Sequence, residues 1–190
     1  MKKFFFTLFL LAFGSLSLWP SISCAFNNEM LEQLKNKNEC QRCDLQYLNW
    51  PKAQLAKANL SGALLLKSQM NDGLFTEAKF VWANLEQAEL TGSDLRQADL
   101  TGADLRHTQL NRVDFTKAYL YGANMTDAKA VGANFTHAFL KGVNLSGADL
   151  QNSNFQGANI DLAVFTDALL GGATWVDGRS CLPQSKGRCQ

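Results

Sequence analysis

Large apolar residues recur at every fifth position along most of this chain. From Leu45 to Trp175 they occupy each residue number divisible by five, without an insertion or a deletion, and only Ala130 is small. Five steps along an α-helix turn a side chain by about 500°, so these residues would scatter around a helix. In a β-strand an odd step sends successive residues to opposite faces. The period therefore predicts a backbone that turns a corner every few residues and points each fifth side chain toward one interior.

A second, smaller residue precedes each of these large centres by two positions. It is usually alanine, as at Ala53, Ala58 and Ala63. One large and one small inward residue in every five fit a narrow, close-packed tube, because protein interiors tolerate neither voids nor excess volume. We expect the centres and the small positions to share one continuous core.

Several five-residue units carry a family resemblance. Ala-Asn-Leu-Ser-Gly, Ala-Asp-Leu-Thr-Gly and Ala-Asp-Leu-Arg-Gln resemble the repeats of the pentapeptide-repeat proteins, whose pattern is A(D/N)LXX. The resemblance covers residues 43–177 and implies an all-β fold, a right-handed, four-sided (quadrilateral) parallel β-helix with four pentapeptides per coil. The repeats would make nearly seven coils, stacked about 4.8 Å apart like neighbouring strands. Both open ends of such a solenoid need caps.

Glycines two residues after a centre offer support for an even number of sides. Seven of them follow a ten-residue sub-period, and Gly147 and Gly157 fall on the other one. Glycine adopts positive φ at tight turns without a steric penalty. We therefore expect two corner types that alternate along the chain, which a four-sided coil can keep in register.

The first 25 residues have the pattern of a secretory signal peptide. Lys2 and Lys3 precede an apolar run that begins at Phe4, and small residues end at Ala25. The run is short for a membrane anchor, and a lipoprotein acylated at Cys24 is also less favoured. We expect cleavage, no stable membrane span afterwards, and a periplasmic or secreted protein. The formal net charge of +1 would stay close to neutral and demands no polyanionic or polycationic partner.

Three further segments complete the expected organisation. Residues 26–43 are expected to form an N-terminal helical cap, residues 44–177 the pentapeptide-repeat β-helix, and residues 178–190 a C-terminal tail. The stretch NNEMLEQLKNKNEC predicts a short helix, which Asn27 or Asn28 can cap. Met30, Leu31 and Leu34 form its apolar side, which would cover the first coil.

Four cysteines remain if Cys24 leaves with the signal peptide. Cys40 and Cys43 lie at the start of the tube, and Cys181 and Cys189 follow its end. An even number in an oxidising compartment favours disulfides. The two pairs lie too far apart on a rigid tube for one shared zinc site. We predict the disulfides Cys40–Cys43 and Cys181–Cys189, with a redox-active Cys40–Cys43 pair as the alternative.

Outward side chains must carry the function of a solenoid. The side with centres 60, 80, 100, 120, 140 and 160 carries the candidate partner-binding residues Val81, Trp82, Tyr119, Tyr121 and Phe139. Tyr119 and Phe139 fall on successive coils, so we expect their rings to stack. Exposed aromatic clusters often mark binding surfaces. The alternative is that these aromatics only stabilise the tube.

Other sides of the tube carry polar ladders. One consists of Asp94, Asp114, Asn134 and Asn154, and another of Asp104, Asn124 and Asn144. Asp94 over Asp114 places like charges on adjacent coils, which costs stability unless a cation or water screens them. Screened surface carboxylates are favoured here over an ion site.

Catalysis finds little support in the residues. The two histidines, His107 and His137, fall on opposite sides of the tube and cannot share a metal or form a relay. No phosphate-binding loop or nucleophile motif is present. We expect no catalytic residue, no metal and no cofactor.

The leading hypothesis is a non-enzymatic exported module that binds a protein partner of unknown identity or has a structural role. A homodimer through an end or a side of the solenoid is a further option. The resemblance also implies an alternative, since some family members protect DNA gyrase from quinolones by mimicking duplex DNA. A DNA mimic should be densely anionic, yet Arg96, Arg106, Arg112 and Lys117 interrupt the acidic rows. We expect no nucleic-acid partner; a secreted effector is the third hypothesis.

Overall fold

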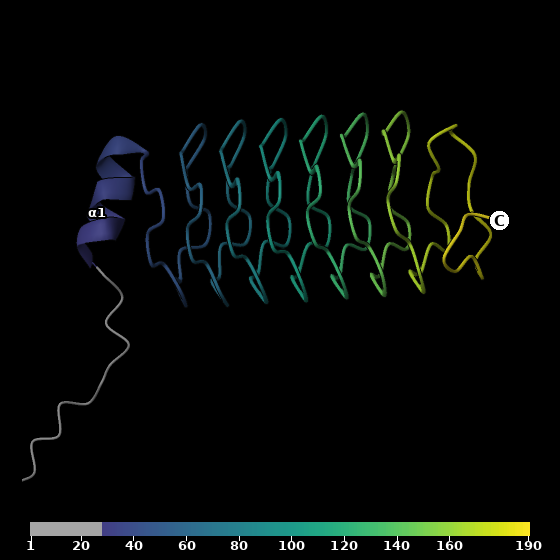
Figure 1. Cartoon of the computed structure of the whole chain (residues 1–190), viewed down its shortest axis with the longest axis horizontal. Helices are drawn as coiled ribbons and strands as arrows, with labels where there is room; N and C mark the ends of the chain where they lie inside the picture. Colours follow the sequence, from purple (N-terminus) through teal and green to yellow (C-terminus); the bar gives the residue numbers. More distant parts are fainter. Residues whose placement is uncertain (1–27) are drawn as a thin grey trace, which may run out of the picture.

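The computed structural model describes residues 28–190. Helix α1 (Asn28–Lys37) lies at one end of an elongated stack of coils, and the C-terminal tail lies at the other (Figure 1). The expected signal peptide, with Cys24, and the candidate cap Asn27 lie outside the described residues. Within residues 28–190, no helix is both long enough and apolar enough to cross a bilayer.

Parallel β-bridges join residues that are 20 positions apart. They run from Glu39↔Asn59 to Asn154↔Thr174, with one bridge in every pentapeptide. Four pentapeptides therefore complete one coil, and the coil has four sides. Each bridge is an isolated pair and not part of a longer strand, because the chain turns a corner directly after each centre. Backbone bonds such as Leu45 N–H to Leu64 O, at 2.8 Å, hold successive coils together.

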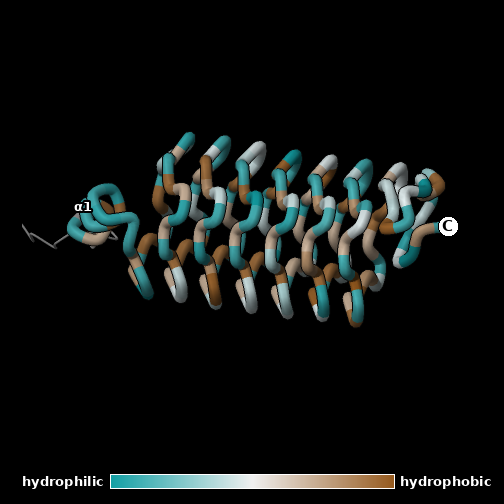
Figure 2. Tube along the Cα trace, turned by 90° about the horizontal axis from the view of Figure 1, so that it is seen from above, coloured by the Kyte–Doolittle hydropathy of each residue, from teal (hydrophilic) through white to brown (hydrophobic). Residues whose placement is uncertain are grey.

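The large centres fill the interior of the stack, as the period predicts. Leu100, Leu120 and Leu140 are fully buried, and apolar segments recur at matching places on successive coils (Figure 2). One interior wall is aromatic. The rings of Phe115 and Phe135 stack with centroids 5.0 Å apart, and Phe155 continues the stack 4.8 Å further on. Centres near the ends, such as Trp50 and Trp175, are only partly buried.

The expected alternation of two corner types is wrong. Every corner from Arg42 to Gly172 has positive φ, and ordinary residues adopt it as readily as glycine does: φ is 54° at Arg42, 62° at Lys57 and 56° at Trp82. Several of the glycines instead leave room for a side chain from the preceding coil. The side chain at a corner leans toward the next coil, where a Cβ on Gly92 would lie 2.5 Å from Asp72 Oδ1.

Helix α1 covers the first coil with the apolar side that the sequence predicts. Leu34 is fully buried, and Met30 and Leu31 are partly buried against the core. Lys35 and Lys37 in the last turn complement the helix dipole. Asn38, with φ at 55°, ends the helix in the left-handed conformation common after a helix C-terminus.

The solenoid begins earlier than the expected boundary at residue 44. The first bridge residue is Glu39, and Cys40 is fully buried at the first centre. Cys43 fills the following small position and is 4% exposed. The first coil therefore uses half-cystines where later coils use leucine and alanine, which is why the apolar period did not reveal it.

Both predicted disulfides are present. Cys40 pairs with Cys43, and Cys181 pairs with Cys189. The tail does more than close on itself, because it pairs antiparallel with the last coil through Leu169↔Lys186 and Thr174↔Ser180. Part of the exposed edge of the solenoid is thereby covered.

Candidate functional site: the outer surface of the solenoid

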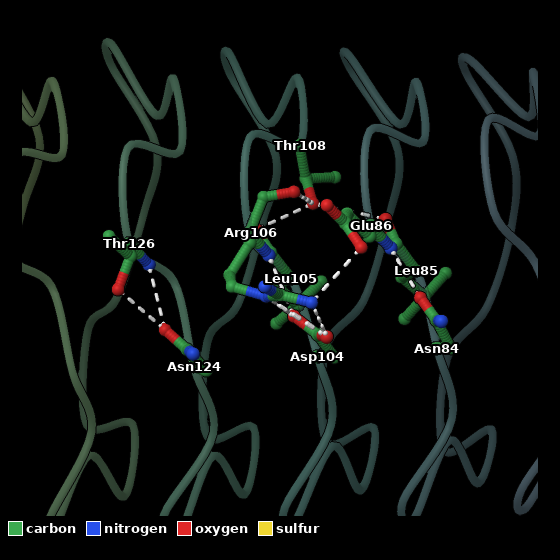
Figure 3. Close-up of polar contacts among 9 residues, drawn as sticks. All are labelled: Asn84, Leu85, Glu86, Asp104, Leu105, Arg106, Thr108, Asn124 and Thr126. Carbon is green, nitrogen blue, oxygen red and sulfur yellow. Dashed lines mark hydrogen bonds and ion pairs between the residues drawn. The ribbon is translucent and has the colours of Figure 1, made fainter.

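Asparagine and aspartate before a centre close the corner that follows. Asp104 Oδ1 accepts a hydrogen bond from the Arg106 backbone N–H at 3.2 Å, and Asn124 Oδ1 accepts one from Thr126 N–H at 3.1 Å (Figure 3). The same bond recurs at Asp94, Asp114, Asn134, Asn144 and Asn154. The polar ladders are thus caps for the turns, in the manner of Asx-turns.

Arg96 screens the like charges of Asp94 and Asp114. Its guanidinium donates to both carboxylate oxygens of Asp94 at 2.8 and 2.6 Å, and its Nε lies 4.0 Å from Asp114 Oδ2. Partial burial acts to raise the pKa of the Asp94 carboxyl, but the hydrogen bonds and charge of Arg96 outweigh it, so the pKa is lowered. No group of three metal-ligating side chains is found in the part of the chain that the structure describes.

Arg106 joins two carboxylates on adjacent coils. Its Nη2 lies 2.7 Å from Asp104 Oδ2 and 3.0 Å from Glu86 Oε2 on the preceding coil (Figure 3). The pKa of the Asp104 carboxyl is lowered, since the bonds from Arg106 outweigh the opposing and individually largest effect of burial. This contact was not predicted from the sequence, although Arg106 and Glu86 have opposite charges and lie 20 positions apart.

Three of the five candidate residues form one cluster on the outside of the tube. The rings of Tyr119 and Phe139 are stacked, with centroids 4.9 Å apart and planes 3° from parallel, as predicted. Tyr121 lies against both, at 6.3 and 5.9 Å between centroids. Tyr119 and Tyr121 remain 41% and 37% exposed. The cluster is therefore a preassembled aromatic patch with accessible edges.

Trp82 lies apart from that cluster. Its side chain is 72% exposed, and its indole occupies the space outside Gly102. With the partly buried Val81 it lines one wall of a surface depression of about 520 Å³. The remaining lining residues are Gln41, Arg42, Ser61 and Gly62. Arg42 was missed, although it holds the same corner position as Trp82 two coils earlier.

The histidines do not form a site. His107 Nδ1 lies 3.9 Å from Asp127 Oδ2, and the His137 ring covers Gly157. Each histidine therefore contacts the coil that follows it and not the other histidine.

The repeats of this chain match a known protein family. The family model for pentapeptide repeats matches residues 39–76, 78–116, 93–129 and 131–167, more than half of the chain. No match was found among curated proteins.

Several solved structures are similar to this chain. One is a pentapeptide repeat protein (Rfr23) from the cyanobacterium Cyanothece 51142, with 20% sequence identity and a TM-score of 0.46. The match covers 72% of this chain and 97% of that chain. Full-length QnrB1, a plasmid-mediated fluoroquinolone resistance protein, has 19% identity and a TM-score of 0.47, and the match covers 73% and 82%. A pentapeptide repeat protein from the thylakoid lumen of Arabidopsis thaliana has 25% identity and a TM-score of 0.28, with 73% of both chains covered.

The family assignment rests on agreement between two independent features. The family model matches the segment in which bridges recur every 20 residues, and the same segment contains the buried centres and the Asx-closed corners. The chain belongs to the pentapeptide-repeat family.

Proposed function

We propose that this protein is a right-handed, exported, non-enzymatic solenoid that binds a protein partner through its aromatic side, defined by Val81, Trp82, Tyr119, Tyr121 and Phe139. One observation carries the proposal. An indole that is 72% exposed and two partly exposed tyrosines share one side of the tube, whereas Phe115 and Phe135 are buried and Tyr47, 53% exposed, lies at a corner on another side.

The chemistry of this side suits a protein partner. Tyrosine, tryptophan and arginine are the residues most enriched at interface hot spots. The Tyr119–Phe139 stack is ordered before any partner arrives, so binding would cost little further side-chain entropy. A rigid backbone with repeated coils also presents its side chains at fixed intervals, as other solenoids do at their binding surfaces.

Export is supported by the cysteine chemistry. Disulfides form and persist in oxidising compartments, and both cysteine pairs in residues 28–190 are bonded. The signal pattern of residues 1–25 points the same way. We infer a periplasmic or secreted protein.

DNA mimicry is the less favoured alternative. QnrB1 is a fluoroquinolone resistance protein with a similar coil. In this chain, however, Arg96 and Arg106 are paired with the carboxylates of the acidic rows. Such rows cannot present the continuous negative charge of a duplex. A gyrase supercoiling assay tests this directly: we expect no inhibition and no protection from quinolones.

Affinity capture tests the proposed interface. Wild-type protein, Trp82→Ala and Tyr121→Ala would be used as bait, with Leu64→Ala as a control, since Leu64 is 40% exposed on another side of the tube. We expect both aromatic variants to lose a partner that the control retains. Equal recovery of every partner by all four proteins would remove the aromatic side as the interface.

A further inference from the structure

We propose that the depression between Arg42 and Trp82 binds an aromatic side chain flanked by a carboxylate in an extended segment of a partner protein. The inference rests on the proposed function and names the chemistry that one part of the aromatic side would recognise. It follows from the spacing, the floor and the charge of this depression.

The spacing fits one inserted ring. Arg42, Gly62 and Trp82 occupy the same corner position on three successive coils. Two coil steps separate the backbones of the outer two by about 9.6 Å, and their side chains keep this separation because Arg42 leans over Gly62 and Trp82 leans over Gly102. Stacked aromatic groups have centroids about 4.5–7 Å apart. A ring midway between the two walls would therefore contact the guanidinium on one side and the indole on the other.

Gly62 gives the floor of the depression no side chain of its own, although the Arg42 side chain leans over it from the preceding coil. Its φ of 68° does not demand glycine, because Gln87 and Gln97 adopt 58° and 59° at equivalent corners. A Cβ at Gly62 would lie 3.1 Å from Arg42 Cγ and would extend into the space between the two walls. Of the neighbouring polar groups, the Ser61 hydroxyl is already bonded to Asn59 Oδ1 at 2.8 Å. The floor is thus shaped to admit a group and offers it little competing polarity.

The charge of the depression favours an anion. Among residues 28–190, Arg42 has no ion-pair partner, whereas Arg96 and Arg106 each contact two carboxylates. A guanidinium can stack on an aromatic face and also bond a carboxylate through its edge. An aromatic residue with an adjacent Asp or Glu would satisfy both capacities. A cationic neighbour would be repelled by the same group.

The size and openness of the depression suit a peptide. Its volume of about 520 Å³ falls within the range of about 300–1,000 Å³ that is usual for ligand sites. The indole wall is 72% exposed, so a bound ring would keep its connection to a chain running along the surface. The aromatic patch of Tyr119, Tyr121 and Phe139 lies further along the same side and could contact the rest of that segment.

Titration with short peptides tests the proposal. The probe is acetyl-Gly-Glu-Tyr-Glu-Gly-amide, followed by the indole N–H resonance of Trp82 in ¹⁵N-labelled protein and assigned with Trp82→Phe. Control peptides replace Tyr with Ala, or both Glu residues with Lys. We expect a saturable shift with the acidic tyrosine peptide and binding at least about tenfold weaker with either control. No saturable shift, or equal binding of the lysine peptide, would overturn the proposal.

Matched variants locate the binding. Gly62→Gln places a side chain in the space between Arg42 and Trp82, and Arg42→Gln removes the positive charge of the depression. Gly142→Gln is the control, because Gly142 is a corner on the same side with φ 71° and has no atom within 4 Å of the place that an added Cβ would take. We expect at least about tenfold weaker peptide binding for the first two and wild-type binding for the control. Wild-type affinity in Gly62→Gln would refute the site, provided that circular dichroism shows an intact fold.

The two proposals fail in different ways. If Tyr121→Ala loses a captured partner but Gly62→Gln retains it and binds the peptide normally, the depression is not the site and the aromatic side remains the interface. If Trp82→Ala and Tyr121→Ala retain every partner, the proposed function is wrong whatever the peptides do.

Discussion

The indole of Trp82 lies over Gly102, one coil further along the solenoid. A Cβ on Gly102 would lie 2.4 Å from two carbons of the Trp82 ring. The same relation holds for Asp127 over Gly147 and His137 over Gly157. A glycine at a corner of this protein therefore often lies beneath a side chain from the preceding coil, and its positive φ is shared by the other corners from Arg42 to Gly172.

Replacement of Gly102 by alanine should displace Trp82. The matched control is Gly122→Ala, a corner on the same side with no atom within 4 Å of the added carbon. Both variants carry an alanine at positive φ, so the difference between them isolates the contact. We expect Gly102→Ala to be less stable than the control by up to about 1 kcal/mol, with a changed Trp82 indole resonance. An unchanged resonance would contradict the contact.

Leu120→Asp should unfold the solenoid. Leu120 is fully buried at a centre, and an unpaired carboxylate there would disrupt the coils on both sides. We expect a loss of more than about 4 kcal/mol in the free energy of unfolding. Leu162→Asp is the control, because Leu162 is 79% exposed on the same side, and its effect should stay within about 0.5 kcal/mol. Urea denaturation of both variants provides the measurement.

The Tyr119–Phe139 stack should contribute to stability independently of any partner. A double-mutant cycle with Tyr119→Ala and Phe139→Ala measures the coupling between the two rings. We expect a coupling energy of about 0.5–1.5 kcal/mol, as for other aromatic pairs. Additive single-variant effects in thermal denaturation would show that the stack is not stabilising and would strengthen a purely binding role.

The ionised Asp104 carboxylate should stabilise the fold above about pH 4. Its pKa lies below the ordinary 3.8 in the folded protein, so its contribution is complete above the unfolded pKa and is lost as the pH falls through the lowered one. Asp104→Asn is a clean test, because Asn84 and Asn124 close the equivalent corners on the neighbouring coils. Bonds that are partly exposed to solvent contribute less than about 1 kcal/mol.

Thermal denaturation across the pH range checks this contribution. The difference in melting temperature between wild type and Asp104→Asn should be present near pH 7, smaller at high salt, and should shrink as the pH falls below the ordinary 3.8. A difference that changes neither with pH nor with salt would show that the charge of Asp104 is irrelevant.

Contacts that follow from the period alone could be predicted before the structure. The five-residue spacing identified Leu100 and Leu120 as interior residues, and the 20-residue coil implied by the family resemblance placed Tyr119 beside Phe139. Both disulfides were also predictable, because each pair lies within one end of the chain. Apart from the disulfides, these results need only the position of a residue within the repeat.

Contacts that depend on the direction of a side chain could not be predicted. The period places Arg106 one coil from Glu86, but not the rotamer that brings its Nη2 within 3.0 Å of the carboxylate. It likewise gives no sign that the first centre is Cys40, since a half-cystine interrupts the apolar pattern.

The sequence by itself determined which residues face the interior, that the chain turns a corner every five residues, and which cysteines form the two disulfides. The interior could be predicted because the tube is narrow and close-packed. Each fifth residue can be buried only by pointing toward its axis, so the spacing identifies the interior residues. Only the tertiary structure decided the exterior. The lean of corner side chains toward the next coil, the bonding of Arg96 and Arg106 within the acidic rows, and the open space between Arg42 and Trp82 arise from neighbours 20 or 40 residues away. Solvent-facing side chains have several rotamers open to them, and packing across coils selects one.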